Sequence, residues 1–307
     1  MKRVELGKTG IEVSRLGIGT GTGLPSGHCA QALMDKDELA RLLLYALDRG
    51  INFWDTAFQY NTYPHIKEAL KQVSRKDVVL TTKFSAANEK ETIRDFNITL
   101  KDLNTDYIDV CLLHGVRTDT ELQMRSGAFN AMVKLKEEGK IRAVGLSSHG
   151  LGALKSVLEM PEIDLVWARV NYAGLNMDTG CLGMYDQMAS IYWLKKCVKL
   201  LPARVKSFIS PKTNSQAIPE DAHKEVTNTL QNIHSQSKGI VGMKVLAEGV
   251  LRNDAEKAVK YVNSLPFVDS FIIGMLNKQE IDENCKIVNT GILSKERNMS
   301  MLNPHNA

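Results

Sequence analysis

The sequence predicts an α/β protein that folds as one (β/α)8 barrel of the TIM type, with an N-terminal β-hairpin and a long insertion after the sixth strand. Short apolar runs alternate with segments of helical periodicity along most of the chain. Eight strand-and-helix units can be counted, and eight parallel strands close a barrel. A length of 307 residues, 43% of them apolar, suits a single large barrel domain.

The first half of the chain predicts the hairpin and five barrel strands. Residues 4–14, centred on Lys8-Thr9-Gly10, are typical of a hairpin outside the barrel. Asp35 and Gly50 are suited to cap the two ends of the first helix. Strands are expected at residues 16–18, 51–55, 78–83, 107–113 and 143–147. Further helices are expected near residues 64–73, 89–103 and 128–138.

The second half predicts three more strands and one long interruption. The strands are expected at residues 164–171, 239–245 and 270–273, with helices near 254–264 and 278–289. Residues 173–238 contain no convincing buried strand, only helices near residues 184–201 and 220–234. A structureless loop of this length is uncommon in a compact domain. We expect this insertion either to pack as an accessory helix on the barrel rim or to cover the catalytic mouth.

Composition argues against several classes of partner. The formal net charge of +4 arises from 39 basic and 35 acidic residues that do not cluster, so no nucleic-acid partner is expected. No run approaches the ~20 apolar residues of a membrane span, and the N-terminus lacks an apolar signal segment, which favours a cytoplasmic protein. The cysteines favour reduced thiols and no metal site, because they form no C-x-x-C pair; they stand at positions 29, 111, 181, 197 and 285. The oligomeric state stays open.

Four ionisable residues stand at or just after the ends of predicted strands: Asp55, Tyr60, Lys83 and His114. Taken singly, Asp55 could cap a helix, Lys83 could begin a surface loop and His114 could be a buried imidazole. The carboxyl ends of barrel strands meet at one mouth, where such barrels place their chemistry. Four such groups at one mouth therefore predict an active site.

The four residues suit the reduction of a carbonyl group. A ketone that accepts hydride gathers negative charge on its oxygen, so the site needs a proton donor and a positive field. Tyr60 is the expected donor, and Lys83 is expected to lower the pKa of its phenol, which is ~10 in water. Asp55 would keep the buried Lys83 charged. His114 would hold the substrate oxygen in place.

Several motifs, in the same order, are similar to those of the aldo-keto reductases. They are DTAFQY at 55–60, TTK at 81–83, DYIDVCLLH at 106–114, KLKEEGKIRAVGLSS at 134–148 and IDEN at 281–284. The resemblance covers the chain except residues 173–238. It implies a nicotinamide-dependent reductase with Asp55, Tyr60, Lys83 and His114 as catalytic tetrad and Tyr60 as general acid. Its substrate would be a small carbonyl or alcohol compound such as an aldehyde, ketone or sugar.

The resemblance also implies which residues contact the cofactor. Ser147 and Ser148 match a Ser-Asn pair that holds the nicotinamide carboxamide, with serine in place of asparagine. Arg169 stands where glutamine is usual, and Glu283 and Asn284 match an adenine-binding pair. The complete expected set is Gly19, Thr20, Gly21, Ser147, Ser148, Arg169, Lys244, Gly274, Leu276, Lys278, Glu280, Glu283 and Asn284. Phe58 and Arg117 are expected to contact the substrate.

The sequence leaves the choice between NADP(H) and NAD(H) open. Glu280 stands where an arginine is common in the family, and a carboxylate repels the adenosine 2′-phosphate, which favours NAD(H). Lys278 and Lys244 favour NADP(H). The glycine run GIGTGTG at 17–23 is not a dinucleotide fingerprint, because Thr22 takes the place of its last glycine and no helix follows directly. It is expected to be the first βα loop, close to the nicotinamide or substrate.

Two alternatives to a conventional reductase stay open at this stage. One is a regulatory or redox-sensing protein that binds the cofactor with little turnover, as some relatives do in ion channels. The other is a sugar isomerase or lyase that uses a tightly held NAD(P) transiently. The complete tetrad favours the reductase.

Overall fold

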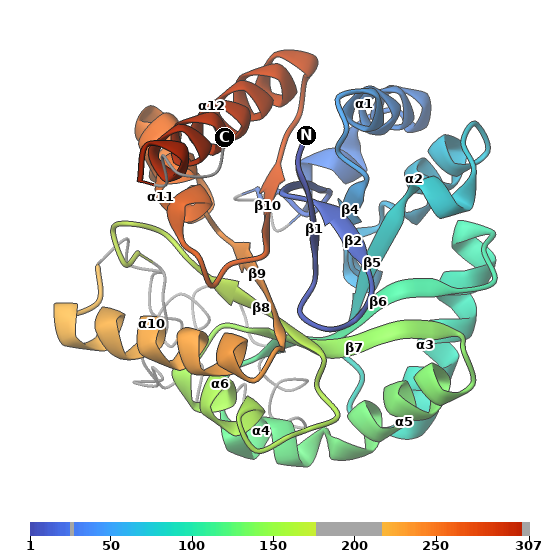
Figure 1. Ribbon diagram of the computed structural model, residues 1–307. Coiled ribbons are helices and arrows are strands. Elements are labelled where there is room, and N and C mark those ends of the chain that lie inside the picture. The colour runs from blue at the N-terminus through green and yellow to red at the C-terminus, as the bar shows by residue number, and fades with distance from the viewer. Residues whose placement is uncertain (25–27, 176–216, 303–307) are drawn as a thin grey trace, which may run out of the picture.

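A closed barrel of eight parallel strands forms the centre of the protein, and helices surround it (Figure 1). The computed structural model describes residues 1–24, 28–175 and 217–302. The strands follow one another around the barrel in the order β10-β3-β4-β5-β6-β7-β8-β9. The predicted (β/α)8 fold with its N-terminal hairpin is therefore confirmed.

The strands lie where the alternation predicts them. The hairpin pairs β1 (Arg3–Glu5) with β2 (Glu12–Ser14) in antiparallel register. The barrel strands are β3 (Leu16–Gly19), β4 (Phe53–Asp55), β5 (Val79–Phe84), β6 (Ile108–Val116), β7 (Ile141–Ser148), β8 (Leu165–Arg169), β9 (Gly239–Met243) and β10 (Ser270–Gly274). Each neighbouring barrel pair is parallel, which places all carboxyl ends at the same mouth.

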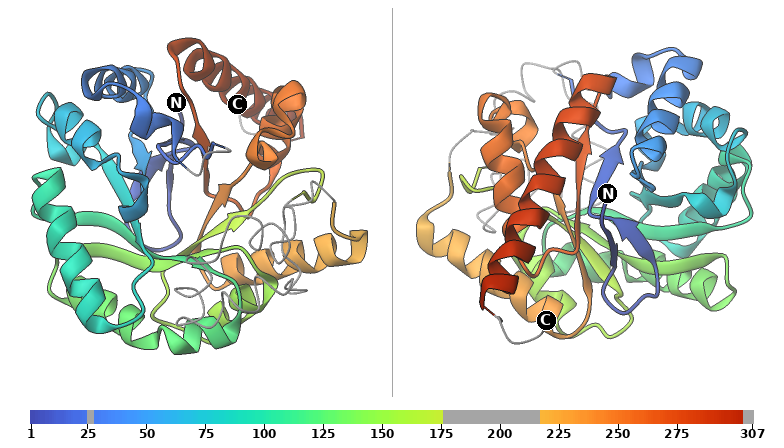
Figure 2. Two further views of the ribbon diagram at one scale, coloured as in Figure 1. Left: turned by 180° about the vertical axis from the view of Figure 1, so that it is seen from behind. Right: turned by 45° about the horizontal axis from the view of Figure 1, so that its top comes forward.

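The helices form a ring outside the barrel, with α12 beside α1 where the ring closes (Figures 1 and 2). They are α1 (Lys36–Asp48), α2 (Tyr63–Leu70), α3 (Glu89–Leu103), α4 (Asp119–Met124), α5 (Ser126–Glu137), α6 (Leu151–Val157), α10 (Glu220–Ser235), α11 (Ala255–Ser264) and α12 (Lys278–Leu302). The sequence did not predict α4 and α6, which are one or two turns long. Among the helices that the structure describes, none has the length and apolar composition needed to span a bilayer.

Local sequence signals explain the ends of α1. The Asp35 side chain accepts hydrogen bonds from the backbone N–H groups of Asp37 and Glu38, so it caps the helix as predicted. Gly50 follows the helix with a φ of +86°, a conformation that glycine adopts without strain. The chain can therefore turn directly into β4.

The core has two layers. The larger layer lies between the strands and the surrounding helices. The second fills the barrel interior, where Phe53 and Trp167 pack among aliphatic side chains. Leu6, Ile11 and Val13 from the hairpin belong to this inner layer and are fully buried, so the hairpin contributes to the apolar core of the barrel itself.

Polar side chains at the starts of alternate barrel strands bind the backbone of a neighbouring strand. The carboxylates at the starts of β6, β8 and β10 accept an N–H from the preceding barrel strand, and the Asn52 amide before β4 accepts one from the hairpin strand β2. The acceptors Asn52, Asp109, Asp164 and Asp269 bind the N–H groups of Ser14, Leu80, Val144 and Ile240 at 2.8, 2.9, 2.8 and 2.9 Å. Buried backbone donors are thereby satisfied at the amino end of the barrel.

The insertion after β8 is described in part. Its second predicted helix is confirmed as α10. The predicted helix near residues 184–201, and with it the hypothesis of a cover over the mouth, lies outside the described residues, as do Cys181 and Cys197.

Replacing Leu6 with alanine should destabilise the fold, because Leu6 is fully buried in the inner core layer. We expect the free energy of unfolding to fall by about 2–5 kcal/mol, the range for buried leucine truncations. Urea unfolding followed by circular dichroism measures this change. Leu33→Ala is the control, because Leu33 is 64% exposed and should change little. Equal stability of the two variants would contradict a role for the hairpin in the core.

Candidate active site

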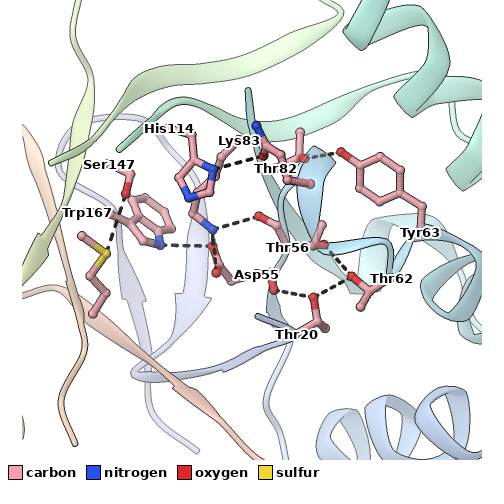
Figure 3. A network of polar contacts seen from close by, with 12 residues as sticks. Thr20, Asp55, Thr56, Thr62, Tyr63, Thr82, Lys83, His114, Ser147 and Trp167 are labelled. Carbon is pink, nitrogen blue, oxygen red and sulfur yellow. Dashed lines mark hydrogen bonds and ion pairs between the residues drawn. The ribbon is translucent and has the colours of Figure 1, made fainter. Parts of the chain in front are cut away.

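A buried ion pair lies at the carboxyl end of the barrel. Lys83 Nζ on β5 lies 2.6 and 2.7 Å from Oδ1 and Oδ2 of Asp55 on β4, and 2.8 Å from the carbonyl oxygen of Thr56 (Figure 3). The two side chains are 2% and 8% exposed. Because a lone charge at this depth would be strongly disfavoured, each residue requires the other.

Burial acts on both members of the pair. It raises the pKa of Asp55 and lowers the pKa of Lys83, and the charge of each partner opposes that shift. The three acceptors around Nζ match the three N–H donors of an ammonium group, whereas a neutral amine has only two. The geometry is therefore that of a charged lysine and a carboxylate.

Tyr60 lies beside this pair on the short helix η2 (Phe58–Tyr60), which follows β4. Lys83 Nζ is 5.3 Å from the centroid of the phenol ring. The ring meets His114 edge to face, with 5.7 Å between ring centroids. Gly21 makes this placement possible, because a Cβ atom at that position would lie 2.2 Å from Cε2 of Tyr60.

The pKa of Tyr60 is shifted in the opposite direction from the one expected. Burial raises the pKa of its phenol, and the negative charge of Asp55 raises it further. The prediction that Lys83 lowers this pKa is therefore wrong for the protein alone. Burial is the main reason, and the Lys83 ammonium does not offset it, since all three of its donors bind Asp55 and Thr56.

Hydrogen bonds between threonine hydroxyls stabilise the loop that carries Tyr60. Thr62 lies 2.9 Å from Thr20 and 2.8 Å from Thr56, measured between the Oγ1 atoms. Thr20 also donates to the carbonyl oxygen of Asp55 at 3.1 Å. Thr20, expected to contact the cofactor, thus uses its side chain to join β3 to the loop after β4 (Figure 3).

His114 ends the apolar part of β6, and hydrogen bonds of its ring and of its backbone help to position it. Its Nδ1 lies 3.1 Å from Oε1 of Gln59. Its carbonyl oxygen accepts a hydrogen bond of 3.0 Å from Arg125, whose guanidinium also binds the carbonyl oxygens of Phe84 and Ala86 at 2.9 and 3.0 Å. The buried Arg125 therefore joins the ends of β5 and β6, close to Lys83 and His114. The sequence did not indicate this role, because an arginine between two helices resembles a surface residue.

Trp167 on β8 is a further contact that the sequence did not indicate. Its indole Nε1 donates to Oδ1 of Asp55 at 3.1 Å. The pattern of LVWAR predicts only a buried strand, and an inward-facing tryptophan in such a strand is usually core. The one available signal was that a buried indole N–H usually finds an acceptor.

Several of the expected cofactor contacts lie at the same mouth, at the ends of β7, β8 and β9. Ser147 donates to the sulfur of Met243 over 3.7 Å, and the Ser148 hydroxyl binds the backbone of Gly150. Arg169 donates to Nδ1 of His149 at 3.1 Å, since a guanidinium cannot accept.

The surroundings of His149 are positively charged. Burial lowers the pKa of His149 far below its ordinary value, and Arg169, Arg117, His114 and Lys244 lower it further. His149 is therefore neutral.

The remaining expected contacts lie in the loop between β10 and α12. Glu280 accepts from Leu276 N at 2.8 Å and from Asn277 Nδ2 at 3.0 Å, while its own N–H binds Asn277 Oδ1 at 2.9 Å. This arrangement resembles a capping box and shapes the loop, with Glu280 bound to the N–H of Leu276, the residue before the N-cap Asn277. Glu283 accepts a hydrogen bond from Gln279, and Asn284 donates to the carbonyl oxygen of Glu280.

Other expected residues are placed as follows. Lys278 lies 4.8 Å from the ring centroid of Tyr45. Gly19 and Gly274 pair in register at the ends of β3 and β10. Lys244 forms an ion pair of 2.9 Å with Glu248.

The two residues expected at the substrate lie in the loops after β4 and β6. Phe58 is half-buried and meets Tyr63 and Phe84 edge to face, with ring centroids 6.3 and 6.1 Å apart. The backbone N–H of Arg117 binds Glu121 at 3.1 Å. Both loops flank the tetrad.

Comparison with known proteins identifies the family. The family model for the Aldo/keto reductase family matches residues 15–303. The chain belongs to the aldo/keto reductase family. It is 35% identical to "Probable aldo-keto reductase 1" of Glycine max over 158 residues, which are 47% of this chain and 44% of that protein. It is 26% identical to the NADH-specific methylglyoxal reductase of Escherichia coli over 205 residues, which are 59% of this chain and 63% of that protein.

A solved structure agrees with the fold of this aldo/keto reductase family member. The aldo-keto reductase from Klebsiella pneumoniae in complex with NADPH aligns with a TM-score of 0.62 at 19% identity. The alignment covers 94% of this chain and 89% of that one. The chain matches less than two thirds of the length of each of these two curated relatives.

Replacing Lys83 with methionine should lower the free energy of unfolding by about 3–5 kcal/mol, because Asp55 would keep a buried charge without its cation. The double variant Asp55→Asn/Lys83→Met should be more stable than Lys83→Met alone, since no uncompensated charge is left. Chemical denaturation at pH 7 measures both. Lys260→Met is the control, because its pair with Glu256 is exposed and should matter little. A double variant as unstable as Lys83→Met would show that the pair is not what limits stability.

Proposed function

We propose that the protein is an NAD(P)(H)-dependent oxidoreductase that moves a hydride between nicotinamide and a carbonyl or alcohol substrate, with Tyr60 as general acid. The observation that carries the proposal is the grouping of a protonated phenol, a buried ammonium–carboxylate pair and an imidazole edge within one mouth. Family membership supports the same reaction class. The substrate class is an aldehyde, ketone or sugar-like carbonyl compound.

Each residue of the tetrad has a distinct task in this proposal. Bound nicotinamide would supply or accept the hydride. Tyr60 holds the proton that the substrate oxygen needs as negative charge gathers on it, and its raised pKa keeps that proton in place beforehand. The His114 ring at the edge of Tyr60 orients the same oxygen. Asp55 keeps Lys83 charged and balances that charge beforehand; in this proposal the ammonium acts on the phenol only as the Tyr60 proton moves and negative charge develops beside it.

The residues at the ends of β7, β8 and β9 fit a nicotinamide dinucleotide. The hydroxyls of Ser147 and Ser148 and the guanidinium of Arg169 are hydrogen-bonding groups suited to a carboxamide. Burial alone would raise the pKa of Glu248, but Lys244 and Arg169 bring it below its ordinary value, which shows a positive field on this side of the mouth. Such a field suits the pyrophosphate of the cofactor.

Coenzyme preference centres on the loop after β10. Glu280 has a structural task as the cap of this loop, and its charge remains close to where the family resemblance places the adenosine ribose. A carboxylate there would oppose a 2′-phosphate, which favours NAD(H), and the relative from Escherichia coli is named as NADH-specific.

The Tyr60→Phe variant should lose carbonyl reduction and keep coenzyme binding, because only the transferable proton is removed. Turnover should fall by about 10²- to 10⁴-fold. Steady-state assays on a panel of aldehydes, ketones and sugars, with fluorescence titration of the reduced coenzyme, measure the two properties. Tyr107→Phe is the control, since Tyr107 precedes β6 at the opposite end of the barrel, under Arg75. Near-normal turnover of Tyr60→Phe would remove Tyr60 from its assigned role.

The Glu280→Gln variant tests coenzyme choice. Titration of the wild-type protein with NADH and NADPH should show tighter binding of NADH. Glu280→Gln should shift the ratio of the two dissociation constants toward NADPH by up to about fivefold, the effect expected of one exposed charge. Glu256→Gln on α11 is the charge-matched control. An unchanged ratio would mean that Glu280 only caps the loop, and binding of neither coenzyme would reject the proposed function.

A further inference from the structure

Trp167 has an unusual position among the residues of the inner core. It lies on β8, three strands away from β5 and four from β4, and it is 1% exposed. Its ring packs edge to face on Phe53, with 5.7 Å between ring centroids. At the same time its N–H points at Oδ1 of Asp55 (Figure 3). The Trp167 side chain therefore contacts both the apolar core inside the barrel and the charged pair of Asp55 and Lys83.

The contact completes the set of donors around the Asp55 carboxylate. Oδ1 accepts from both Lys83 and Trp167, whereas Oδ2 accepts from Lys83. An indole can donate a hydrogen bond and cannot accept one, so this contact stabilises the carboxylate more than the protonated acid. Because Trp167 approaches from across the barrel, it also prevents the carboxylate from turning away from Lys83.

We propose that Trp167 is a positioning residue of the active site, whose indole N–H holds Oδ1 of Asp55 so that the carboxylate stays ionised and directed at Lys83. The inference rests on the proposed function, in which Lys83 serves Tyr60. It adds a residue from β8 to a tetrad that otherwise comes from β4, β5, β6 and the loop after β4.

The direction of the expected pH effect follows from the groups that face Asp55. They are Lys83 from β5, Lys244 after β9, Tyr60 from the loop after β4 and Trp167 itself. Of these groups, only Trp167 changes when the indole N–H is removed. Loss of this hydrogen-bond donor raises the pKa of Asp55. The carboxylate is then protonated at a higher pH, so the acid limb of the rate profile moves upward.

The variant Trp167→Phe removes the donor and keeps an aromatic ring. Trp54→Phe is its matched control, because Trp54 is also fully buried, precedes Asp55 directly and has an indole N–H without a hydrogen-bond partner among the described residues. If Trp167→Phe does not fold, benzothienylalanine at position 167 keeps the shape of tryptophan and lacks the N–H. One readout is the pH profile of kcat/KM for carbonyl reduction. The other is the ¹³C NMR titration of the Asp55 carboxyl, assigned by its loss in Asp55→Asn.

We expect the Asp55 titration and the acid limb to move upward by about one to two pH units in the position-167 variant, the worth of a hydrogen bond to a charged group, and to stay in place in Trp54→Phe. A position-167 variant with an unmoved Asp55 titration, or equal shifts in both variants, would overturn the inference. The NMR titration needs no turnover. If the Asp55 titration moves in the position-167 variant, but neither the wild-type protein nor the variant reduces any carbonyl compound, the positioning of Asp55 by Trp167 is supported and the proposed function fails.

Discussion

The ion pair between Asp55 and Lys83 is the constraint on which the site depends. Two opposite charges lie at the top of an apolar barrel interior, where neither is stable without the other. Asp55 lies on β4 and Lys83 on β5. The pair is also bound by the Thr56 carbonyl, directly after β4, and by the Trp167 indole on β8. These strands hold the pair together only when the barrel is closed in its observed register. The closed barrel and the assembled site therefore depend on the same strand register, and a shift of β5 by one residue would turn Lys83 out of the barrel.

The amino end of the barrel uses similar chemical groups for a different purpose. Asp109 is buried as deeply as Asp55, yet it binds Arg75, Arg142 and the backbone N–H of Leu80. Asp109, Asp164 and Asp269 tie β6, β8 and β10 to the preceding barrel strand, and Asn52 ties β4 to the hairpin strand β2. A buried carboxylate in this fold thus stabilises the barrel at one end, and at the other it binds Lys83 in the mouth where the proposed reaction takes place. Its position along the strand decides which, since the mouth is formed by carboxyl ends alone.

Much of the fold could be predicted because its signals are local. Alternating strands and helices, the cap at Asp35 and the ionisable residues that end strands are all visible within short windows. The contacts of Arg125 and Trp167 could not be predicted, because each depends on a partner that the closed barrel brings near from a distant part of the chain. The pKa of Tyr60 was misjudged for a similar reason. The sequence shows that a lysine is available, and only the structure shows that its three donors are already bound to other atoms.

The hydrogen bonds of Lys83 bear on the role proposed for the Tyr60 phenol. Lys83 lies over the Tyr60 ring, but its hydrogen bonds go to Asp55 and Thr56, and its charge is balanced by Asp55 at 2.6 Å. Burial then dominates, so Tyr60 keeps its proton. A neutral phenol is the form that a general acid requires, and it is the wrong form for removing a proton from an alcohol. Under the proposed function, the protein alone therefore holds Tyr60 in the form that carbonyl reduction requires. Oxidation of an alcohol would need an added positive charge beside Tyr60 to lower the pKa of its phenol. Under the proposed function, a molecule bound in the mouth would have to supply that charge.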